Sequence, residues 1–232
     1  PSAYLHGASP TQLAEELCRL SKLDSQQSEA WAVYLPESQT MEYVVATHES
    51  IARGIFHKLT GALTSQGLQI LSADIHTLAD GLVLDRFRVK DPDFAGQPDQ
   101  DRIERVKRVL LDSLTGDEAP VFRKLWQHRK KSTAANVHRQ PTRVRVDNNT
   151  STKFTILDIF ATDQTGLLYT IANRLFHSNL SVAGAKIGTY LDQVVDVFYV
   201  TDRLGGKIEN EQRLRDIRQQ LLDAIAQLEA EA

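Results

Sequence analysis

The chain is poor in residues that carry covalent or metal chemistry: its 232 residues include one cysteine and one methionine. A single cysteine excludes an internal disulfide framework and a zinc site built from several cysteines. We expect Cys18 to be a small apolar residue on the first helix. The sequence has no run of eighteen apolar residues, so we expect no membrane insertion.

Signatures of catalysis and nucleotide binding are also missing. The chain has no G-x-S-x-G, no G-x-G-x-x-G and no P-loop pattern. His48 and Glu49 do not begin an H-E-x-x-H motif, because Ala52 stands where the second histidine would be. The seven histidines are scattered, with no i, i+4 pair. We therefore predict no active site, no metal site and no cofactor in this chain.

Charge is unevenly distributed around a net value of −3. Residues 123–145 contain eight Lys or Arg and no Asp or Glu. This stretch is either a solvated linker or a patch for an acidic partner, with Arg129, Lys130 and Lys131 as its centre. No aromatic residue after Trp126 is interleaved with these charges, so nucleic acid is not an expected partner.

The N-terminal sequence shows no initiator methionine, no charged-then-apolar leader and no lipidation motif. This pattern favours a cytoplasmic protein, and in particular a piece excised from a longer one.

An internal repeat organises the chain. Shifting the sequence by 112 residues brings 54–80 over 166–192, and a shift of 111 aligns 83–114 with 194–225. Apolar residues, glycines and aspartates coincide through four successive elements, for example Gly54 with Gly166 and Asp85 with Asp196. Such a match indicates two copies of one structural unit.

Each copy reads as strand, helix, strand, strand, helix. In the second copy, 167–176 and 214–228 have helical apolar spacing, whereas 180–190 and 194–201 alternate and are rich in Val, Ile and Tyr. This order predicts an α+β fold of ferredoxin-like type, an antiparallel sheet with helices on one face. Strands at 30–35 and 142–148 precede the copies and are predicted to fill the fourth-strand place, in their own sheet or in that of the other copy.

The repeat predicts the domain boundaries. Residues 1–29 form a helical connector, with Ser9 as N-cap and Pro10 at the first helical position. The two copies occupy 30–115 and 142–232, and residues 116–141 join them through a helix at 118–131 and the basic linker.

A possible ligand loop lies in the second copy, where "TDQTGLL" (162–168) joins a strand to a helix. Gly166 allows close approach of a ligand, and the first-turn amides favour an anion such as a carboxylate. Asp163 offers a partner for an ammonium, so that a free amino acid would suit both ends. Alternatively, Asp163 or Thr165 only caps the helix and Gly166 only permits the turn. The first copy has Ile51 in place of the aspartate.

Asp85 and Asp196 share a face with apolar residues of their strands. An acid in that position must be hydrogen-bonded or lie at a sheet edge, so a structural role is expected. A functional, titrating role would require a neighbouring group that the sequence does not identify.

The segment "DQTGLLYTIANRLFHSNLSVAGAKIGTYLDQVVDVFYVTDRLGGKI" (163–208) resembles the second ACT domain of the bifunctional uridylyltransferase/uridylyl-removing enzymes that modify the nitrogen-regulatory protein PII. Residues 41–114 resemble the preceding ACT domain more loosely, and "YLHGASPTQLAEELCRL" (4–20) is similar to the segment after their phosphohydrolase domain. The nucleotidyltransferase signature and the His-Asp dyad of that family are absent. The chain is thus expected to be a regulatory portion without catalytic domains.

The resemblance implies two ACT domains, which generally pair side by side and bind an amino acid at the pair's interface, here glutamine. It implies a ligand loop facing a strand, formed by Asp163, Gln164, Thr165, Gly166, Leu167, Ser181, Val182 and Ala183. A second site at Arg53 and Gly54 is in question, because the first copy departs from D-x-x-G. Implied partners are the parent's catalytic domains, PII, and a second chain if ACT pairing joins two chains.

Two functions remain open. One is a glutamine sensor that shifts the balance of the parent's two activities. The other is a structural or protein-docking module that uses the ACT pair and the basic linker without a small-molecule ligand. An enzyme of ferredoxin-like fold, such as an acylphosphatase, ranks third because no Arg and Asn pair is placed for it.

Overall fold

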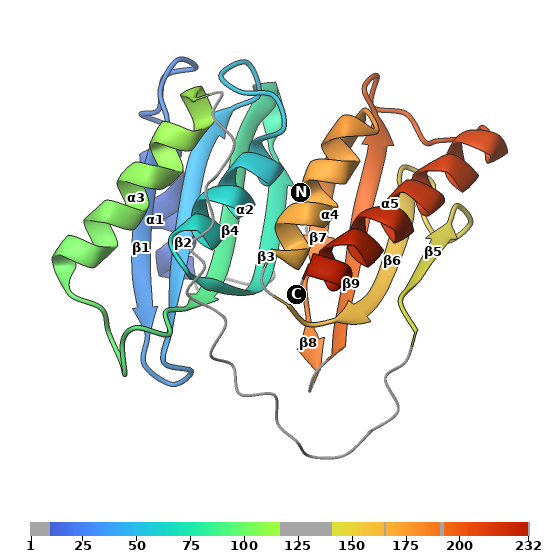
Figure 1. The fold of residues 1–232 in the computed structure, drawn as a ribbon. Coiled ribbons are helices and arrows are strands. Elements are labelled where there is room, and N and C mark those ends of the chain that lie inside the picture. The colour runs from blue at the N-terminus through green and yellow to red at the C-terminus, as the bar shows by residue number, and fades with distance from the viewer. Residues whose placement is uncertain (1–9, 117–140, 165, 191–192, 232) are drawn as a thin grey trace, which may run out of the picture.

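The computed structural model describes residues 10–116, 141–164, 166–190 and 193–231, which form two α+β units side by side (Figure 1). Each unit is an antiparallel sheet with two helices on one face. The α+β, ferredoxin-like fold predicted from the repeat is confirmed. None of the helices in these ranges has the length and apolar character needed to cross a membrane.

The first unit consists of β1 (Glu29–Leu35), β2 (Thr40–His48), α2 (Ile55–Ser65), β3 (Gln69–Thr77), β4 (Leu82–Lys90) and α3 (Gln100–Thr115). A short 3-10 turn, η2 (Ala79–Gly81), joins β3 to β4. The sheet has the order β1-β2-β4-β3, and all its pairs are antiparallel.

The second unit consists of β5 (Arg143–Asp147), β6 (Thr155–Thr162), α4 (Leu167–His177), β7 (Leu180–Lys186), β8 (Thr189–Tyr190), β9 (Gln193–Asp202) and α5 (Glu211–Glu231). Its sheet has the order β5-β6-β9-β7, and β8 also pairs with β9. In both units the leading strand pairs with the first core strand of its own sheet. The prediction that β1 and β5 fill the fourth-strand place is therefore confirmed, within each unit.

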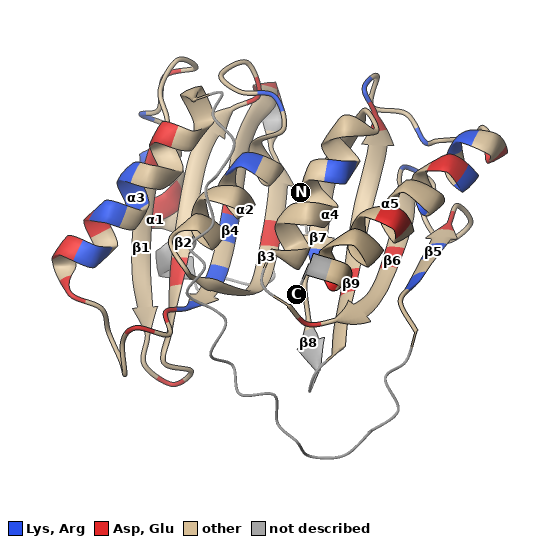
Figure 2. Cartoon of the chain, viewed as in Figure 1, with Lys and Arg blue, Asp and Glu red and all other residues tan. Residues whose placement is uncertain are grey.

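Apolar spacing explains how the helices lie on the sheets. The buried side chains of α3 recur every three or four residues, at Ile103, Val106, Leu110 and Leu114, and those of α5 recur in the same way. Charged residues occupy the outward faces of both helices (Figure 2). Burial of these apolar stripes against the sheets, rather than helix propensity, provides most of their stability.

The two units share one core. The edge strands β3 and β7 lie next to each other, as do α2 and α4 (Figure 1). Phe56 on α2 joins both units, because its ring stacks on Phe87 of the first sheet at 6.2 Å and meets Phe198 of the second edge-on at 6.1 Å. The side-by-side pairing of the two copies thus occurs within a single chain.

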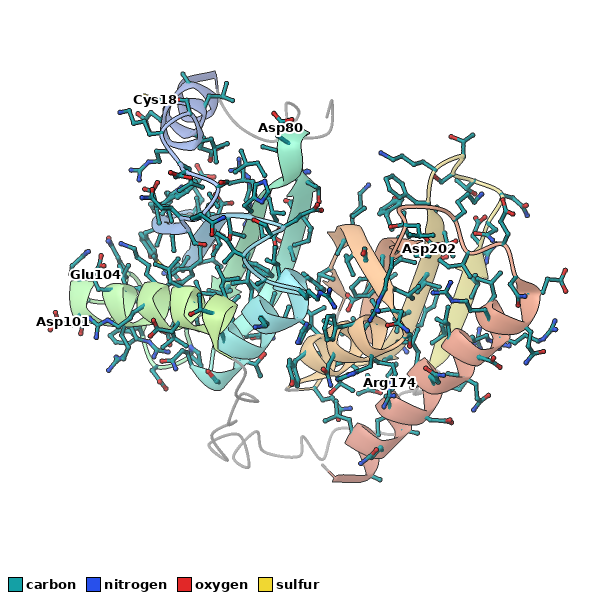
Figure 3. All side chains as sticks on the ribbon, turned by 90° about the horizontal axis from the view of Figure 1, so that it is seen from above. Cys18, Asp80, Asp101, Glu104, Arg174 and Asp202 are labelled. Carbon is teal, nitrogen blue, oxygen red and sulfur yellow. The ribbon has the colours of Figure 1, made fainter. Side chains whose placement is uncertain are left out.

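The N-terminal helix α1 (Pro10–Leu20), predicted as part of a connector, packs against the first unit. It lies on the face of the first sheet opposite to α3, as Figure 3 shows by the labels of Cys18 and Glu104. Leu20 is buried there with Val44, and Cys18 is exposed. The predicted helix at 118–131 and the basic residues Arg129, Lys130 and Lys131 lie outside the described ranges.

Candidate functional site

The loop between β2 and α2 is held in place by His48. The Nε2 atom of His48 donates to the Asp80 carbonyl at 2.5 Å, and its Nδ1 atom accepts from the Ser50 amide at 3.1 Å. This pattern requires the neutral ring with the proton on Nε2. The loop is thereby fixed to the β3–β4 turn before it enters α2.

Gly54 ends this loop as the N-cap of α2, with a φ of 67°. No side chain caps the helix, so the amides of its first turn are left without helical partners. A Cβ atom on Gly54 would overlap the rings of His57 and Phe176. Glycine is therefore required both by the backbone conformation and by the close approach of α4 from the second unit.

A cavity of about 650 Å³ lies where this loop meets the second unit. From the first unit it is lined by the β2–α2 loop, the start of α2, and parts of β3 and β4. From the second unit it is lined by α4, the start of β7 and the end of β9. This volume is within the usual range for small-molecule sites. Because both units form its walls, a ligand there would contact both.

Both units contribute positive charge to the lining of the cavity. Arg53 in the loop and Arg203 after β9 line the cavity and are exposed, and the start of α2 adds the partial positive charge of a helix N-terminus. Hydroxyl groups from Thr77, Ser181 and Thr201 also line it. The positive groups suit a carboxylate, and the hydroxyls suit a polar side chain.

Three acidic residues line the cavity, each in a different environment. Glu49 is exposed in the loop. Asp202, labelled in Figure 3, already accepts from the amides of Leu204 and Gly206, both at 2.9 Å. Asp85 on β4 is 1% exposed, and neither carboxylate oxygen has a hydrogen-bond partner of standard geometry.

Burial raises the pKa of the Asp85 carboxyl to about 8, and the backbone N–H of His76 only partly offsets this effect. The side chain is therefore mainly neutral at pH 7. The sequence pattern put Asp85 on an apolar face and favoured a structural role, but among the described residues neither carboxylate oxygen has a hydrogen bond of standard geometry that would support one. Its position in a cavity wall formed by both units could not be inferred from the alternation of one strand.

The equivalent aspartate of the second unit has a partner. Asp196 accepts from the Gly188 amide at 3.3 Å through Oδ1, whereas Oδ2 is buried without a hydrogen bond. Burial raises its pKa to about 8, against the effect of the Gly188 amide and with a contribution from the nearby charge of Asp163. The two copies thus provide a matched pair of acids, of which only Asp85 lines the described cavity.

His57 also lines the cavity. Its ring stacks on Phe176 at 4.3 Å between ring centres, and its Nδ1 atom is buried without a hydrogen-bond partner. Burial, followed by the charges of Lys58 and His177, lowers the pKa of His57 to about 4. At neutral pH the ring is uncharged, so it forms part of the apolar wall and adds no cation to Arg53 and Arg203.

The loop predicted as the main site has the same local geometry as the first. Gly166 is the N-cap of α4 with a φ of 83°, no side chain caps the helix, and Leu167 is buried. Gln164 has a buried amide nitrogen without a hydrogen-bond partner. A Cβ on Gly166 would meet nothing within 4 Å, so the space beside it is open. Thr165 lies outside the described residues.

The strand residues grouped with this loop lie elsewhere, which corrects the predicted site. Asp163 follows the residue of β6 that pairs with Gln193, whereas Ser181 pairs with Thr201 at the other end of β9. Eight residues of strand, about 26 Å at roughly 3.3 Å per residue, separate these positions. Ser181 and Val182 instead line the cavity at Arg53 and Gly54, while Ala183 and the Asp163 loop do not line it.

The physical reason is the pairing of the units. The end of β3 lies beside the start of β7, so the loop of one unit faces the strand of the other. The repeat relates Ser181 and Val182 to Gln69 and Ile70 at the start of β3. The Asp163 loop would therefore find its strand partner in the first unit, a relation that only the three-dimensional pairing reveals.

Comparisons with known proteins agree with this architecture. Residues 143–228 match the family model of the ACR9-like, ACT-like domain. The chain is 34% identical over 174 residues to the bifunctional uridylyltransferase/uridylyl-removing enzyme of Azospirillum brasilense, covering 75% of this chain and 19% of the relative. The enzyme of the same name from Rhodospirillum rubrum is 35% identical over 193 residues, covering 83% and 20%. The chain thus spans about a fifth of the length of these relatives.

Among solved structures, the trimeric bacterial microcompartment shell protein PduB aligns over 90% of this chain and 91% of its own, with a TM-score of 0.29 and 7% identity. A score this low supports no conclusion about function or fold.

Proposed function

We propose that this chain, which carries an ACT-like domain and is similar over most of its length to the bifunctional uridylyltransferase/uridylyl-removing enzymes, is the amino-acid-sensing regulatory portion of such an enzyme. Its ligand is a free amino acid, with glutamine as the first candidate. In the parent protein, ligand binding would control the addition and removal of uridylyl groups on PII by separate catalytic domains. The chain itself is proposed to be non-catalytic.

The observation that carries this proposal is the cavity between the two units. Its walls include the uncapped start of α2, Arg53 and Asp85 from the first unit, and hydroxyl groups from both units. A free amino acid has a carboxylate, an ammonium and, in glutamine, a polar side chain. Each of these groups has a chemically suitable counterpart in the walls.

The position of the cavity also provides a mechanism of control. A ligand that contacts the β2–α2 loop and the start of β7 at once stabilises the arrangement of the units in which those walls are close. It shifts an equilibrium only if it binds the alternative arrangement less tightly. The parent's two activities would respond through this difference in affinity.

A thermal-shift scan of the chain against the twenty amino acids, with nucleotides as controls, tests the proposal. A native-state ligand at a hundred times its dissociation constant stabilises by about 2.7 kcal/mol, or roughly 5 to 11 °C for a chain of this size. We expect such a rise with L-glutamine. No rise with any amino acid would contradict a sensing function for this portion of the enzyme.

A docking module is the alternative function, and it predicts a different result. Its basic residues, Arg129, Lys130 and Lys131, lie outside the described ranges. If docking is the function, charge reversal at these three residues abolishes binding to the catalytic portion or to PII and leaves the melting temperature indifferent to amino acids.

A further inference from the structure

Asp85 is buried in the cavity wall with fewer partners than a carboxylate needs, since the His76 N–H is the only backbone group of the described residues that lowers its pKa. It is 1% exposed, and both oxygens lack a hydrogen bond of standard geometry. Buried polar groups in folded proteins are nearly always hydrogen-bonded, because an unsatisfied group costs roughly 1 to 3 kcal/mol. A partner supplied by a ligand would remove this cost only when the ligand is bound.

We propose that Asp85 binds the ammonium group of the amino-acid ligand, while the first-turn amides of α2 bind its carboxylate. The inference rests on the proposed function and deepens it, because it assigns the polarity of the ligand in the cavity. The carboxyl group that binds the ammonium then belongs to β4. It is supplied neither by Asp163 nor by the residue aligned with it in the first copy, Ile51.

The surroundings of Asp85 favour a cation over other ligands. Asp85 pairs across the sheet with Val45 on β2 and with Ile75 on β3, and neither side chain is charged. The neutral ring of His57 on α2 does not compete for the carboxylate. The charged groups that share the cavity come from the β2–α2 loop and from the end of β9, namely Glu49, Arg53, Asp202 and Arg203.

Asp196 offers a natural control. It occupies the same strand position in the second unit, with a similar burial and a carboxyl pKa raised in the same direction. It differs in having the Gly188 amide as a partner and in not lining the cavity. Replacing Asp196 therefore imposes a comparable change on the fold without touching the proposed ligand.

Binding should be coupled to the release of a proton. Before binding, burial holds the pKa of Asp85 at about 8, so the carboxyl is mainly protonated at pH 7. An ammonium beside it favours the ionised form, so the proton leaves as the ligand enters. Below the pKa of Asp85 the affinity should rise with pH, by up to about tenfold per unit, because one proton is exchanged.

Isothermal titration at pH 7 in two buffers of different ionisation enthalpy tests this. The probes are L-glutamine and 4-carbamoylbutanoate, which is glutamine without its amino group. The proteins are the wild-type chain, Asp85→Asn and Asp196→Asn, each checked by its melting curve. We expect wild type and Asp196→Asn to release close to one proton with L-glutamine and to prefer it over 4-carbamoylbutanoate by at least about tenfold. Asp85→Asn should lose both the preference and the proton release.

Three results would overturn the proposal. If Asp85→Asn binds L-glutamine like wild type, with the same proton release, the assignment of Asp85 is wrong while the sensing function stands. If wild type itself does not distinguish the two probes, the same conclusion follows without any variant. If wild type binds no amino acid, both the assignment and the proposed function are wrong.

Discussion

At the scale of single residues, two aspartates and two glycines at equivalent positions of the repeat allow the two units to be compared. Asp85 and Asp196 are acids buried at equivalent positions, and Gly54 and Gly166 are left-handed N-caps at equivalent positions. Asp85 lines the cavity between the units and Asp196 does not, whereas a Cβ atom on Gly54 would meet Phe176 of the other unit and one on Gly166 would meet nothing within 4 Å. Each pair therefore separates the cost of the local conformation from the effect of the contact between units.

The free energy of unfolding should fall as pH rises through the range in which these carboxyl groups are protonated in the folded chain and ionised in the unfolded chain. Burial raises the pKa of Asp196 from 3.8 to about 8, so between these values the unfolded chain has lost a proton that the folded chain keeps. The Asp196→Asn variant should not show this loss of stability as pH rises, because asparagine cannot ionise. We expect this variant to match wild type near pH 4 and to be more stable by about 1 to 3 kcal/mol at pH 8.

Urea unfolding at both pH values measures this difference. Equal stability of the two proteins at pH 8 would mean that Asp196 is solvated or fully hydrogen-bonded in solution.

The glycines give a second comparison. Gly166→Ala adds only the strain of a positive φ, about 1 to 2 kcal/mol, because the space around it is open. Gly54→Ala adds overlap with His57 and Phe176 to the same strain, so its cost should be larger by about 1 to 3 kcal/mol. Chemical denaturation of both variants gives the two values. A cost for Gly54→Ala no greater than that of Gly166→Ala would show that the units do not pack closely at α2 and α4.

At the scale of elements, α1 distinguishes the two units. It covers the back of the first sheet, where Glu16 forms a two-pronged ion pair with Arg86. In the described part of the chain no helix covers the equivalent face of the second sheet, where Phe160 and Val195 pair across strands and are 37% and 38% exposed. The same sheet topology thus carries different coverings in the two copies.

The ion pair predicts how firmly α1 is attached. Glu16 is 6% exposed, so Glu16→Ala removes this ion pair from a largely buried Arg86, whose guanidinium also lies 3.9 Å from the Glu42 carboxylate. We expect a loss of about 1 to 3 kcal/mol and faster amide exchange in α1. Arg19→Ala is the control, because Arg19 and its partner Glu29 are both exposed, and it should cost less than about 1 kcal/mol. Equal effects of the two variants would indicate that α1 is not docked through Glu16.

The elements themselves could largely be predicted, because apolar spacing and the repeat both depend on residues close in sequence. Helices α2 and α4 begin and end at residues related by the repeat, and the leading strands pair as expected. Grouping Asp163 with Ser181 failed because it assumed that the loop and strand of one copy face each other. Which loop faces which strand depends on how β3 packs beside β7. The alternation of residues along one strand does not predict which strand of the other unit lies beside it.

At the scale of the whole molecule, the two units form one body with a continuous core and a ligand-sized cavity at their junction. Because the two units belong to one chain, every molecule contains both walls of the cavity. The two loops can also differ in sequence, because each copy can change independently of the other. The loop that departs from D-x-x-G is the one that lines the cavity with Asp85.

The most direct test is a crystal structure of the chain grown with L-glutamine. We expect one bound ligand between the units, with its carboxylate at the start of α2, its ammonium at Asp85 and its side chain toward Ser181. Ligand bound only at the Asp163 loop, or a cavity that stays empty when L-glutamine is shown to bind in solution, would contradict it.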